Sequence, residues 1–332
     1  MALTVFTPTY NRKHTLVRTF DSLCRQTSDI FEWLIIDDGS SDDTRDWVEG
    51  LGEKIVQEGD RFDWMGRRIE GKDSNHFLIK VLRPEGRTPL HIHYVKKENG
   101  GLYTGYNVAY ALIETELCVC IDSDDFMPDD AVERILKCWA DRPKKKVYGG
   151  IVGLDFSVVD GKPIGGFFPP DLSECWQLEL GLHHIHVGDT KEVLRTDLMK
   201  KVAPMIGFKG EKHFNPWYMV KQVVDEYPML VINGNLCWVD YQIGKDSMSQ
   251  AIWKQYLDSP RSFAKHRIMW MQMRHNTWKN KFKNCVHYVS SCILAKDKDW
   301  FKNTPLRGMT MLAVPFGIAL TVLVLWKNRK LK

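Results

Sequence analysis

The sequence predicts an α/β protein built on an open, mostly parallel sheet with helices on both faces. Along the first 244 residues, short apolar segments alternate with segments in which apolar residues recur at helical spacing. The apolar segments are nearly continuous, which is typical of strands buried on both faces of a parallel sheet. With 332 residues, 44% of them hydrophobic, the chain can form a sizeable core, which excludes a disordered or collagen-like protein.

The expected elements follow one another in a regular order. Leu16, Phe20 and Leu23 share one face of the first expected helix. The last helix of the first series has a proline near its start and acidic residues in its first turn, both favourable there. Strands are expected at residues 3–6, 31–36, 91–95 and 117–121, and helices at residues 12–25, 103–114 and 128–140. Further strands are expected within residues 147–159 and at 229–232, and further helices at 188–202 and 216–227.

Residues 51–90 interrupt this alternation. The segment is charged, and its apolar residues are scattered without a clear period. We therefore expect an insertion beside the sheet, within a first domain that spans residues 1–244.

The charge of the chain is unevenly distributed. Residues 245–332 contain 17 Lys and Arg against 4 Asp and Glu, a net charge of 17 − 4 = +13, so residues 1–244 carry 4 − 13 = −9. Basic, aromatic and methionine residues are mixed over residues 261–283, which indicates an amphipathic helix. Such a helix packs on the domain or lies on an anionic bilayer, and the basic excess favours the bilayer. Residues 245–305 are the expected second region.

Residues 306–332 form a hydrophobic segment with a basic end. No charged residue occurs over residues 308–326, which is long enough for a membrane span, and four basic residues follow. Pro315 and Gly317 interrupt the segment, so a monotopic or re-entrant hairpin is favoured over a single span or a buried core helix. Because basic ends favour the cytosol, we expect the protein at the cell membrane, on its cytoplasmic face.

The cysteines and the first residues of the chain both indicate the cytosol. Eight scattered cysteines lack the spacing of a zinc site or a disulfide framework, so we expect reduced thiols, as in the cytosol. The first residues lack the pattern of a secretory signal. No nucleic-acid recognition module accompanies the basic residues, and no nucleic acid partner is expected.

Polar clusters follow three of the expected strands. The segments are TPTYN at residues 7–11, DD at residues 37–38 and DSDD at residues 122–125. Ligands of open parallel sheets bind at the carboxyl ends of the strands, so these clusters are expected on one rim. Crowded carboxylates raise one another's pKa unless a cation lies among them. A divalent cation, Mn²⁺ or Mg²⁺, bound together with a phosphate-bearing ligand would meet that need.

Four segments resemble the family 2 glycosyltransferases, which have the GT-A nucleotide-sugar fold. They are TPTYNR at residues 7–12, IIDDGSSDDT at residues 35–44, KENGGLYTGYNVA at residues 97–109 and CIDSDD at residues 120–125. They occur in the family's order, and the resemblance extends to about residue 244. It implies a nucleotide-sugar donor, with UDP expected as its nucleotide.

The resemblance also implies roles for individual residues. Those matching nucleotide-sugar contacts are Pro8, Thr9, Tyr10, Arg12, Asp37, Asp38, Asn99, Gly100, Gly101, Asn107, Asp122 and Ser123. Asp122, Asp124 and Asp125 match the metal ligands. Glu211 matches the acidic residue downstream that serves as the base, although an exposed glutamate paired with Lys209 or Lys212 is the alternative.

These inferences predict an inverting, metal-dependent glycosyltransferase. Its acceptor is expected to be a saccharide or lipid-linked saccharide, because a basic and aromatic tail would hold the site at a membrane. The family resemblance implies surface polysaccharide synthesis as the setting. The alternatives are a non-catalytic nucleotide-binding scaffold of a glycan assembly complex and a nucleotidyltransferase on a similar fold.

Overall fold

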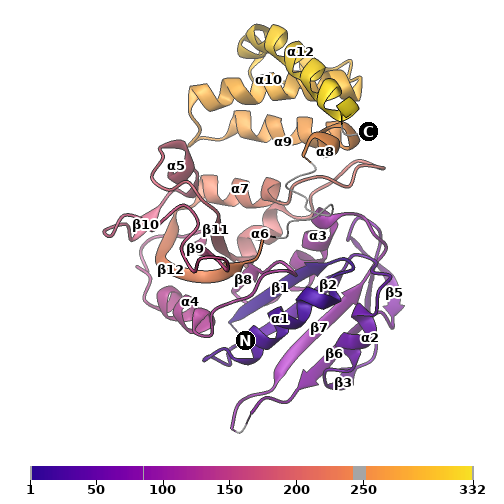
Figure 1. The fold of residues 1–332 in the computed structure, drawn as a ribbon, viewed down its shortest axis with the longest axis vertical. Coiled ribbons are helices and arrows are strands. Elements are labelled where there is room, and N and C mark those ends of the chain that lie inside the picture. The colour runs from indigo at the N-terminus through magenta and orange to yellow at the C-terminus, as the bar shows by residue number, and fades with distance from the viewer. Residues whose placement is uncertain (1, 85, 242–251, 331–332) are drawn as a thin grey trace.

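The protein is an α/β unit followed by a helical unit, seen in a computed structural model that describes residues 2–84, 86–241 and 252–330 (Figure 1). The strands of the main sheet are β1 (Leu3–Thr9), β2 (Phe31–Asp37), β3 (Glu53–Val56), β6 (His76–Val81), β7 (Leu90–Lys96), β8 (Leu117–Cys120), β9 (Gly150–Ser157), β10 (Glu174–Cys175), β11 (Thr190–Arg195) and β12 (Met229–Val239). Among the described residues these ten strands have the order β10-β12-β9-β11-β8-β1-β2-β7-β6-β3.

Helices cover both faces of this sheet. They are α1 (Lys13–Cys24), α2 (Thr44–Glu49), α3 (Leu102–Leu112), α4 (Ala131–Ala140), α5 (Gln177–Leu182), α6 (Thr196–Val202) and α7 (Trp217–Glu226). The helical unit contains α8 (Ile252–Asp258), α9 (Pro260–Gln272), α10 (Trp278–Ala295), α11 (Trp300–Asn303) and α12 (Arg307–Lys330).

Both faces of the central strands are buried, as the continuous apolar segments predict. Strands β8, β1, β2 and β7 run parallel. Successive side chains of a strand point to opposite faces. Val5 packs into one core with side chains of α1, α2 and α4. Phe6 packs into a second core with side chains of α3, α6 and α7. The predicted fold class, a mostly parallel sheet between helices, is confirmed.

Three sequence-based expectations differ from the structure. Residues 51–90 do not lie wholly beside the sheet, since β6 and β3 extend its edge and only the hairpin of β4 (Gly59–Phe62) and β5 (Arg68–Asp73) is separate. The helix predicted over residues 188–202 is wrong in its first half, because Thr190–Arg195 pairs with β8 and β9. The helix predicted over residues 261–283 is divided between α9 and α10.

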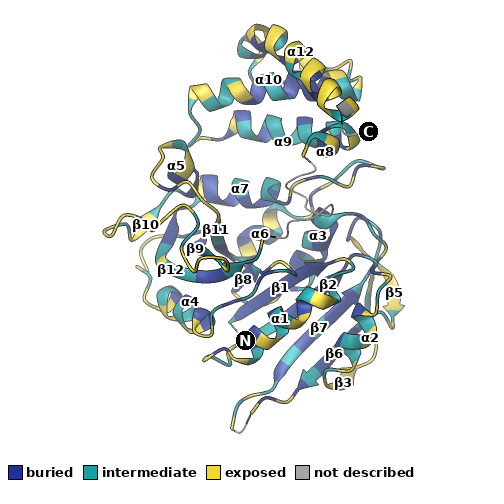
Figure 2. Cartoon of the chain, viewed as in Figure 1, coloured by how far each residue is buried: buried dark blue, intermediate teal, exposed yellow. Residues whose placement is uncertain are grey.

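The helical unit packs directly on the α/β unit. Met269 and Met273, on and just after α9, belong to the second core of the sheet. A third core joins α9, α10 and α12 through Met271, Tyr288 and Ala313. One face of α12 therefore lies against α10, whereas its other face is exposed (Figure 2).

The exposed face of α12 is apolar. Its large exposed side chains are Met311, Leu312, Phe316, Ile318, Val322, Leu323, Leu325 and Trp326. Among the described residues, one helix, Arg307–Arg329, is long and apolar enough to cross a membrane, and 28% of its most apolar window is buried. This apolar surface is available for a further contact.

We predict that a bulky residue at Gly317 separates α12 from α10. A Cβ there would lie 2.5 Å from Val289 Cγ1 and 3.1 Å from the Val286 carbonyl oxygen. Overpacking of this kind costs about 1–3 kcal/mol. Gly317→Leu should therefore lower the melting temperature, measured by circular dichroism, by several degrees. Gly308→Leu is the matched control, because no atom lies within 4 Å of a Cβ at Gly308. Equal melting temperatures for both variants would contradict this packing.

Candidate active site

A cavity of about 1340 Å³ opens at the carboxyl ends of the parallel strands. Side chains on the rim of such a sheet commonly bind ligands. Predicted site residues in its lining are Pro8, Thr9, Tyr10, Arg12, Asp38, Asn99, Gly101, Asp122, Ser123, Asp124 and Asp125. Asp37, Gly100, Asn107 and Glu211 are predicted site residues that lie outside the lining.

Asp38 joins β2 to the glycine-rich turn before α3. Its carboxylate accepts hydrogen bonds from the backbone N–H groups of Gly100, at 3.0 Å, and Gly101, at 2.8 Å. It also forms an ion pair with Lys97, which is only 5% exposed. Burial lowers the pKa of Lys97, and the charge of Asp38 opposes that shift. The turn is thereby fixed as one wall of the cavity.

Gly101 has no room for a side chain. Its φ angle is +96°, and a Cβ there would lie 2.3 Å from the carbonyl oxygen of Lys212. Only glycine adopts this backbone conformation without strain. The turn and the segment around Lys212 therefore pack backbone against backbone at the edge of the cavity.

Asp37 and Asn107 support the site from behind. The Asp37 carboxylate accepts from the backbone N–H of Ser40 at 2.6 Å and from the Tyr94 hydroxyl at 2.5 Å. The Asn107 amide donates to the carbonyl oxygens of Met65 and Met205. Both side chains are buried and hydrogen-bonded within the protein, so they support the site and present no open surface to a ligand.

The end of β1 supplies an open aromatic face. Tyr10 is 50% exposed and lines the cavity, so its ring can lie against a planar ligand. Asn11 adopts a φ of 53° and accepts from the backbone N–H of Ser41 at 2.7 Å, which links this turn to the loop after β2. Arg12 lies 3.8 Å from the Asp124 carboxylate.

The aspartates after β8 are crowded and only partly neutralised. Burial raises the pKa of Asp125 to about 8, Lys191 opposes the shift, and the negative charges of Asp122 and Asp124 add to it. Burial and the charge of Asp122 also raise the pKa of Asp124. Additional positive charge would therefore be bound favourably here.

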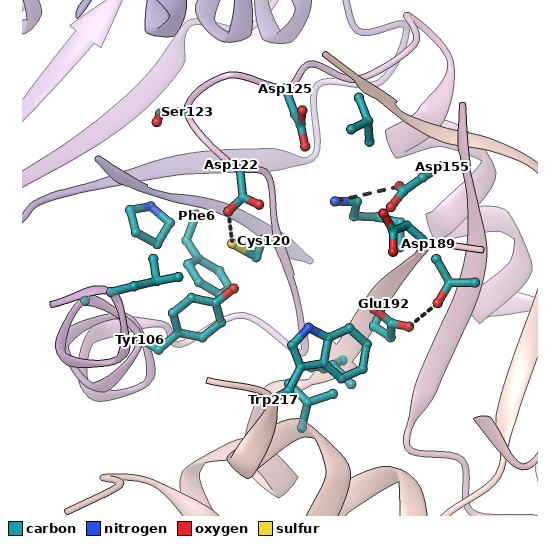
Figure 3. A pocket seen from close by; sticks show the side chains of 18 of the residues that line it. Phe6, Tyr106, Cys120, Asp122, Ser123, Asp125, Asp155, Asp189, Glu192 and Trp217 are labelled. Atoms are coloured by element: carbon teal, nitrogen blue, oxygen red, sulfur yellow. Dashed lines mark hydrogen bonds and ion pairs between the residues drawn. The ribbon is translucent and has the colours of Figure 1, made fainter. Parts of the chain in front are cut away.

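The aspartates fit a divalent cation that shares its ligands with a phosphate. Among the described residues, no three His, Cys, Asp or Glu side chains converge closely enough to hold a metal ion. Mg²⁺ typically binds through one or two protein carboxylates together with substrate phosphates. Asp122 points into the cavity, and Asp124 lines it (Figure 3). Asp125 is 5% exposed and accepts from the backbone N–H of Asp240 at 3.2 Å.

A second wall of the cavity comes from β9, β11, α5 and α7. Strand β11 runs antiparallel to β8, with Val193 opposite Val119, so its first residues extend past the end of β8. Lys191 lies 3.7 Å from Asp155, and Asp155 lies across the cavity from Asp122 and Asp125 (Figure 3). Burial raises the pKa of Asp155 to about 6, against the opposing effect of Lys191.

Glu192 is a buried carboxylate on this second wall. Its Oε1 accepts from Thr190 Oγ1 at 2.6 Å and from Gln177 Nε2 at 3.1 Å. Burial raises its pKa to about 7, which Thr190 and Lys221 oppose. A carboxyl group with a pKa near neutrality is suited to proton transfer.

Lys221 and two tryptophans complete the second wall. The Lys221 ammonium donates to Gln177 Oε1 at 2.7 Å and lies 4.4 Å from the ring centroid of Trp217 and 5.7 Å from that of Trp270. Burial lowers the pKa of Lys221 to about 8. Aromatic faces beside hydrogen-bonding groups suit a sugar ring, which presents C–H groups on one face and hydroxyls at its edge.

Sequence reasoning missed the second wall. Lys191 and Glu192 lie in the segment that was assigned to a helix, and Gln177 and Lys221 lie on other elements. Residues 190–195 carry a weak strand signal. Three polar residues precede a short apolar pair, as in a strand whose first residues extend beyond the sheet. Without the pairing partners of the strand, that signal is too short to interpret.

Glu211 has protein partners and lies beside the cavity. Its Oε1 accepts from the backbone N–H of Arg261 at 3.1 Å and from Arg261 Nε at 2.9 Å. Its Oε2 accepts from the backbone N–H of Ser262 at 2.7 Å. The carboxylate is thus bound to the start of α9 and not to Lys209 or Lys212, and this placement does not favour the role of a base.

Comparisons with known proteins agree with the fold. The profile of the family "Glycosyl transferase family 2" matches residues 4–68 and 77–186. TuaG of Bacillus subtilis (strain 168), a glycosyltransferase whose name places it in teichuronic acid biosynthesis, is 22% identical over 253 residues, 76% of this chain and 83% of that protein. Validoxylamine A glucosyltransferase of Streptomyces hygroscopicus is 46% identical over 55 residues, 16% of this chain and 13% of that enzyme.

The fold also matches solved structures. The crystal structure of residues 1–349 of S. aureus TarS in complex with UDP-GlcNAc superposes with a TM-score of 0.58 at 16% identity, covering 99% of this chain and 92% of that chain. This match shows a common GT-A fold. Together with the family match over more than half of the chain, it shows that this protein belongs to glycosyl transferase family 2 and is a nucleotide-sugar glycosyltransferase.

Proposed function

We propose that the protein transfers a sugar from a UDP-linked donor to a saccharide or lipid-linked saccharide acceptor at the cytoplasmic face of a membrane. The observation that carries this proposal is a single cavity with two different walls. One wall holds an exposed aromatic ring and an aspartate cluster, and the other holds Glu192, Lys221 and two tryptophans. The TarS complex with UDP-GlcNAc supports UDP as the nucleotide, and the name of TuaG supports surface polysaccharide synthesis.

The first wall would bind the donor. Tyr10 would lie against the uracil, and Arg12, Asn99 and the Gly101 turn would surround the nucleotide and its diphosphate. Asp122 and Asp124 would hold Mn²⁺ or Mg²⁺ together with the diphosphate oxygens. A cation bound there supplies Lewis-acid stabilisation of the charge on the diphosphate leaving group.

The second wall would bind the acceptor and accept its proton. Trp217 and Trp270 would pack against a sugar ring, and Lys221 and Gln177 would orient its hydroxyls. We propose Glu192, rather than Glu211, as the base. Its carboxylate takes the proton of the attacking hydroxyl, whose oxygen forms a bond to the anomeric carbon as the bond from that carbon to the phosphate oxygen breaks. A single displacement of this kind inverts the anomeric centre.

We predict that UDP binding depends on a divalent cation and on the two cavity-lining aspartates. Calorimetric titration should show UDP binding with Mn²⁺ and a large loss with EDTA. Asp122→Asn and Asp124→Asn should remove the Mn²⁺-dependent part of the affinity, since each takes away a charged ligand. Asp129→Asn is the matched control, because Asp129 is an exposed carboxylate paired with Arg25. UDP binding that is equal with Mn²⁺ and with EDTA would refute the metal site.

We predict that Glu192→Gln lowers kcat by about 100-fold or more, because general base catalysis typically contributes that much. UDP release from a UDP-sugar measures turnover, and calorimetry should show unchanged UDP affinity. In the wild type, kcat should rise with pH through about 7, because Glu192 must be ionised to act as a base. Activity should fall again above about 8, where Lys221 loses its charge. If Glu211→Gln loses kcat while Glu192→Gln keeps full activity, Glu211 is the base instead.

We also predict that the exposed face of α12 binds an anionic bilayer. Phe316 and Val322 project from this face, and Lys327 and Arg329 lie at its end. Phe316→Glu with Val322→Glu should abolish sedimentation with vesicles of phosphatidylglycerol and phosphatidylcholine. Val159→Glu is the control, since Val159 is 88% exposed on the α/β unit. If the double variant sediments as the wild type does, α12 is not the membrane contact.

A further inference from the structure

The segment between α6 and α7 is held from two sides. On one side lies the start of α9, in the helical unit. On the other side lies the turn at residues 99–101, which lines the proposed donor site. The segment spans residues 203–216 and contributes Lys212 and His213 to the cavity.

The start of α9 depends on a carboxylate from the α/β unit. The first N–H groups of a helix have no partner within the helix, and the helix dipole favours a negative charge there. The first turn of α9 contains no acidic residue, and Ser259 at its N-cap makes no side-chain cap. Glu211 supplies the acceptor instead, binding the N–H groups of Arg261 and Ser262. Glu211 is 5% exposed and Ser262 is 1% exposed, so water does not replace these bonds easily.

Three further contacts attach the segment to α9. Arg261 Nη2 donates to the Lys209 carbonyl oxygen at 3.0 Å. Lys265 Nζ donates to the Ile206 carbonyl oxygen at 2.9 Å. The backbone N–H of His213 donates to Ser259 Oγ at 3.1 Å.

The same segment packs against the donor side of the cavity. Lys212 Nζ donates to Asn99 Oδ1 at 2.6 Å. The Lys212 carbonyl oxygen occupies the space that a Cβ on Gly101 would need, and a Cβ on Gly207 would lie 2.3 Å from the Tyr103 hydroxyl oxygen. Gly101 in turn donates its N–H to Asp38. A continuous series of short contacts therefore runs from α9 to the wall of the donor site.

We infer that α9 is a structural part of the donor site, and that Glu211 and Arg261 are positioning residues that hold Lys212, Asn99 and Gly101 in place for the nucleotide. This inference rests on the proposed donor site. It gives the helical unit a role beyond membrane contact. It also explains a buried glutamate at the position where the family resemblance implied a base.

Hydrogen–deuterium exchange of the unliganded full-length protein tests the coupling without any substrate. Glu211→Gln replaces one acceptor oxygen with an N–H₂ donor that faces a backbone N–H, and Arg261→Met removes the guanidinium contacts. Both variants should accelerate exchange over residues 97–103 as well as 203–216. Arg274→Met is the matched control, because the Arg274 guanidinium pairs with Glu226 at an exposed site of the same unit. Unchanged exchange over residues 97–103 in both variants would overturn the inference.

Donor binding supplies the functional readout. Loss of a buried, charge-assisted hydrogen bond should weaken UDP binding by about tenfold in Glu211→Gln. The donor KM should rise similarly, while kcat at saturating donor and its pH dependence stay as in the wild type. Loss of kcat with unchanged KM would instead identify a base and overturn the positioning role.

The two measurements distinguish a failure of the proposed donor from a failure of the inference about α9. A wild type that binds no UDP would refute the proposed donor, whereas the exchange result would still decide whether α9 controls the turn. If Glu211→Gln fails to fold, Ser259→Ala removes only the acceptor for His213 N–H and should give a smaller acceleration over the same residues. No acceleration in Ser259→Ala and Arg261→Met would overturn the inference.

Discussion

The buried carboxylate of Asp38 is the interaction on which the donor side of the site depends. A buried ion pair is favourable only when hydrogen bonds satisfy its remaining lone pairs, since both ions lose their hydration. Here Lys97 supplies the charge, and the backbone N–H groups of Gly100 and Gly101 supply the hydrogen bonds. The end of β2 and the start of α3 thus form one rigid corner, and the exposed ring of Tyr10 lies on the same cavity.

The two walls differ in how far their charges are balanced. Burial and the neighbouring carboxylates raise the pKa values of Asp124 and Asp125, so this wall favours additional positive charge. On the second wall, Glu192 and Lys221 are joined through Gln177 and balance each other. An anionic donor bound together with a divalent cation would meet the first wall, and a neutral sugar ring would meet the second.

Local sequence predicts most residues of the first wall but not the hydrogen-bonded residues of the second wall. Residues such as Asp122 and Tyr10 directly follow apolar strands, so the end of the strand alone predicts their place on the rim. Residues 190–195 became a strand because β8 and β9 offered unpaired edges, which is information from distant parts of the chain. The partner of Glu211 lies 50 residues away on α9, and spacing does not reveal such a contact. Between the two helices that divide residues 261–283, the backbone N–H groups of Arg274 and His275 likewise donate to a distant residue, Asp225.

The reversed direction of β11 has a consequence for how such enzymes diversify. Because β11 runs against β8, its first residues reach the rim that the parallel strands reach with their last residues. Most of the lining therefore comes from two stretches of one chain, residues 6–125 and residues 155–221, and the rest from Val239, Asp240, Tyr241, Trp270 and Asn280. Substitutions at Glu192 or Lys221 would change the second wall without touching the corner formed by Asp38, whereas Lys212, in the same later stretch, contacts Asn99 of the first wall. If the first wall binds the donor and the second the acceptor, as proposed, changes confined to the second wall would select a new acceptor while the activated sugar stays the same.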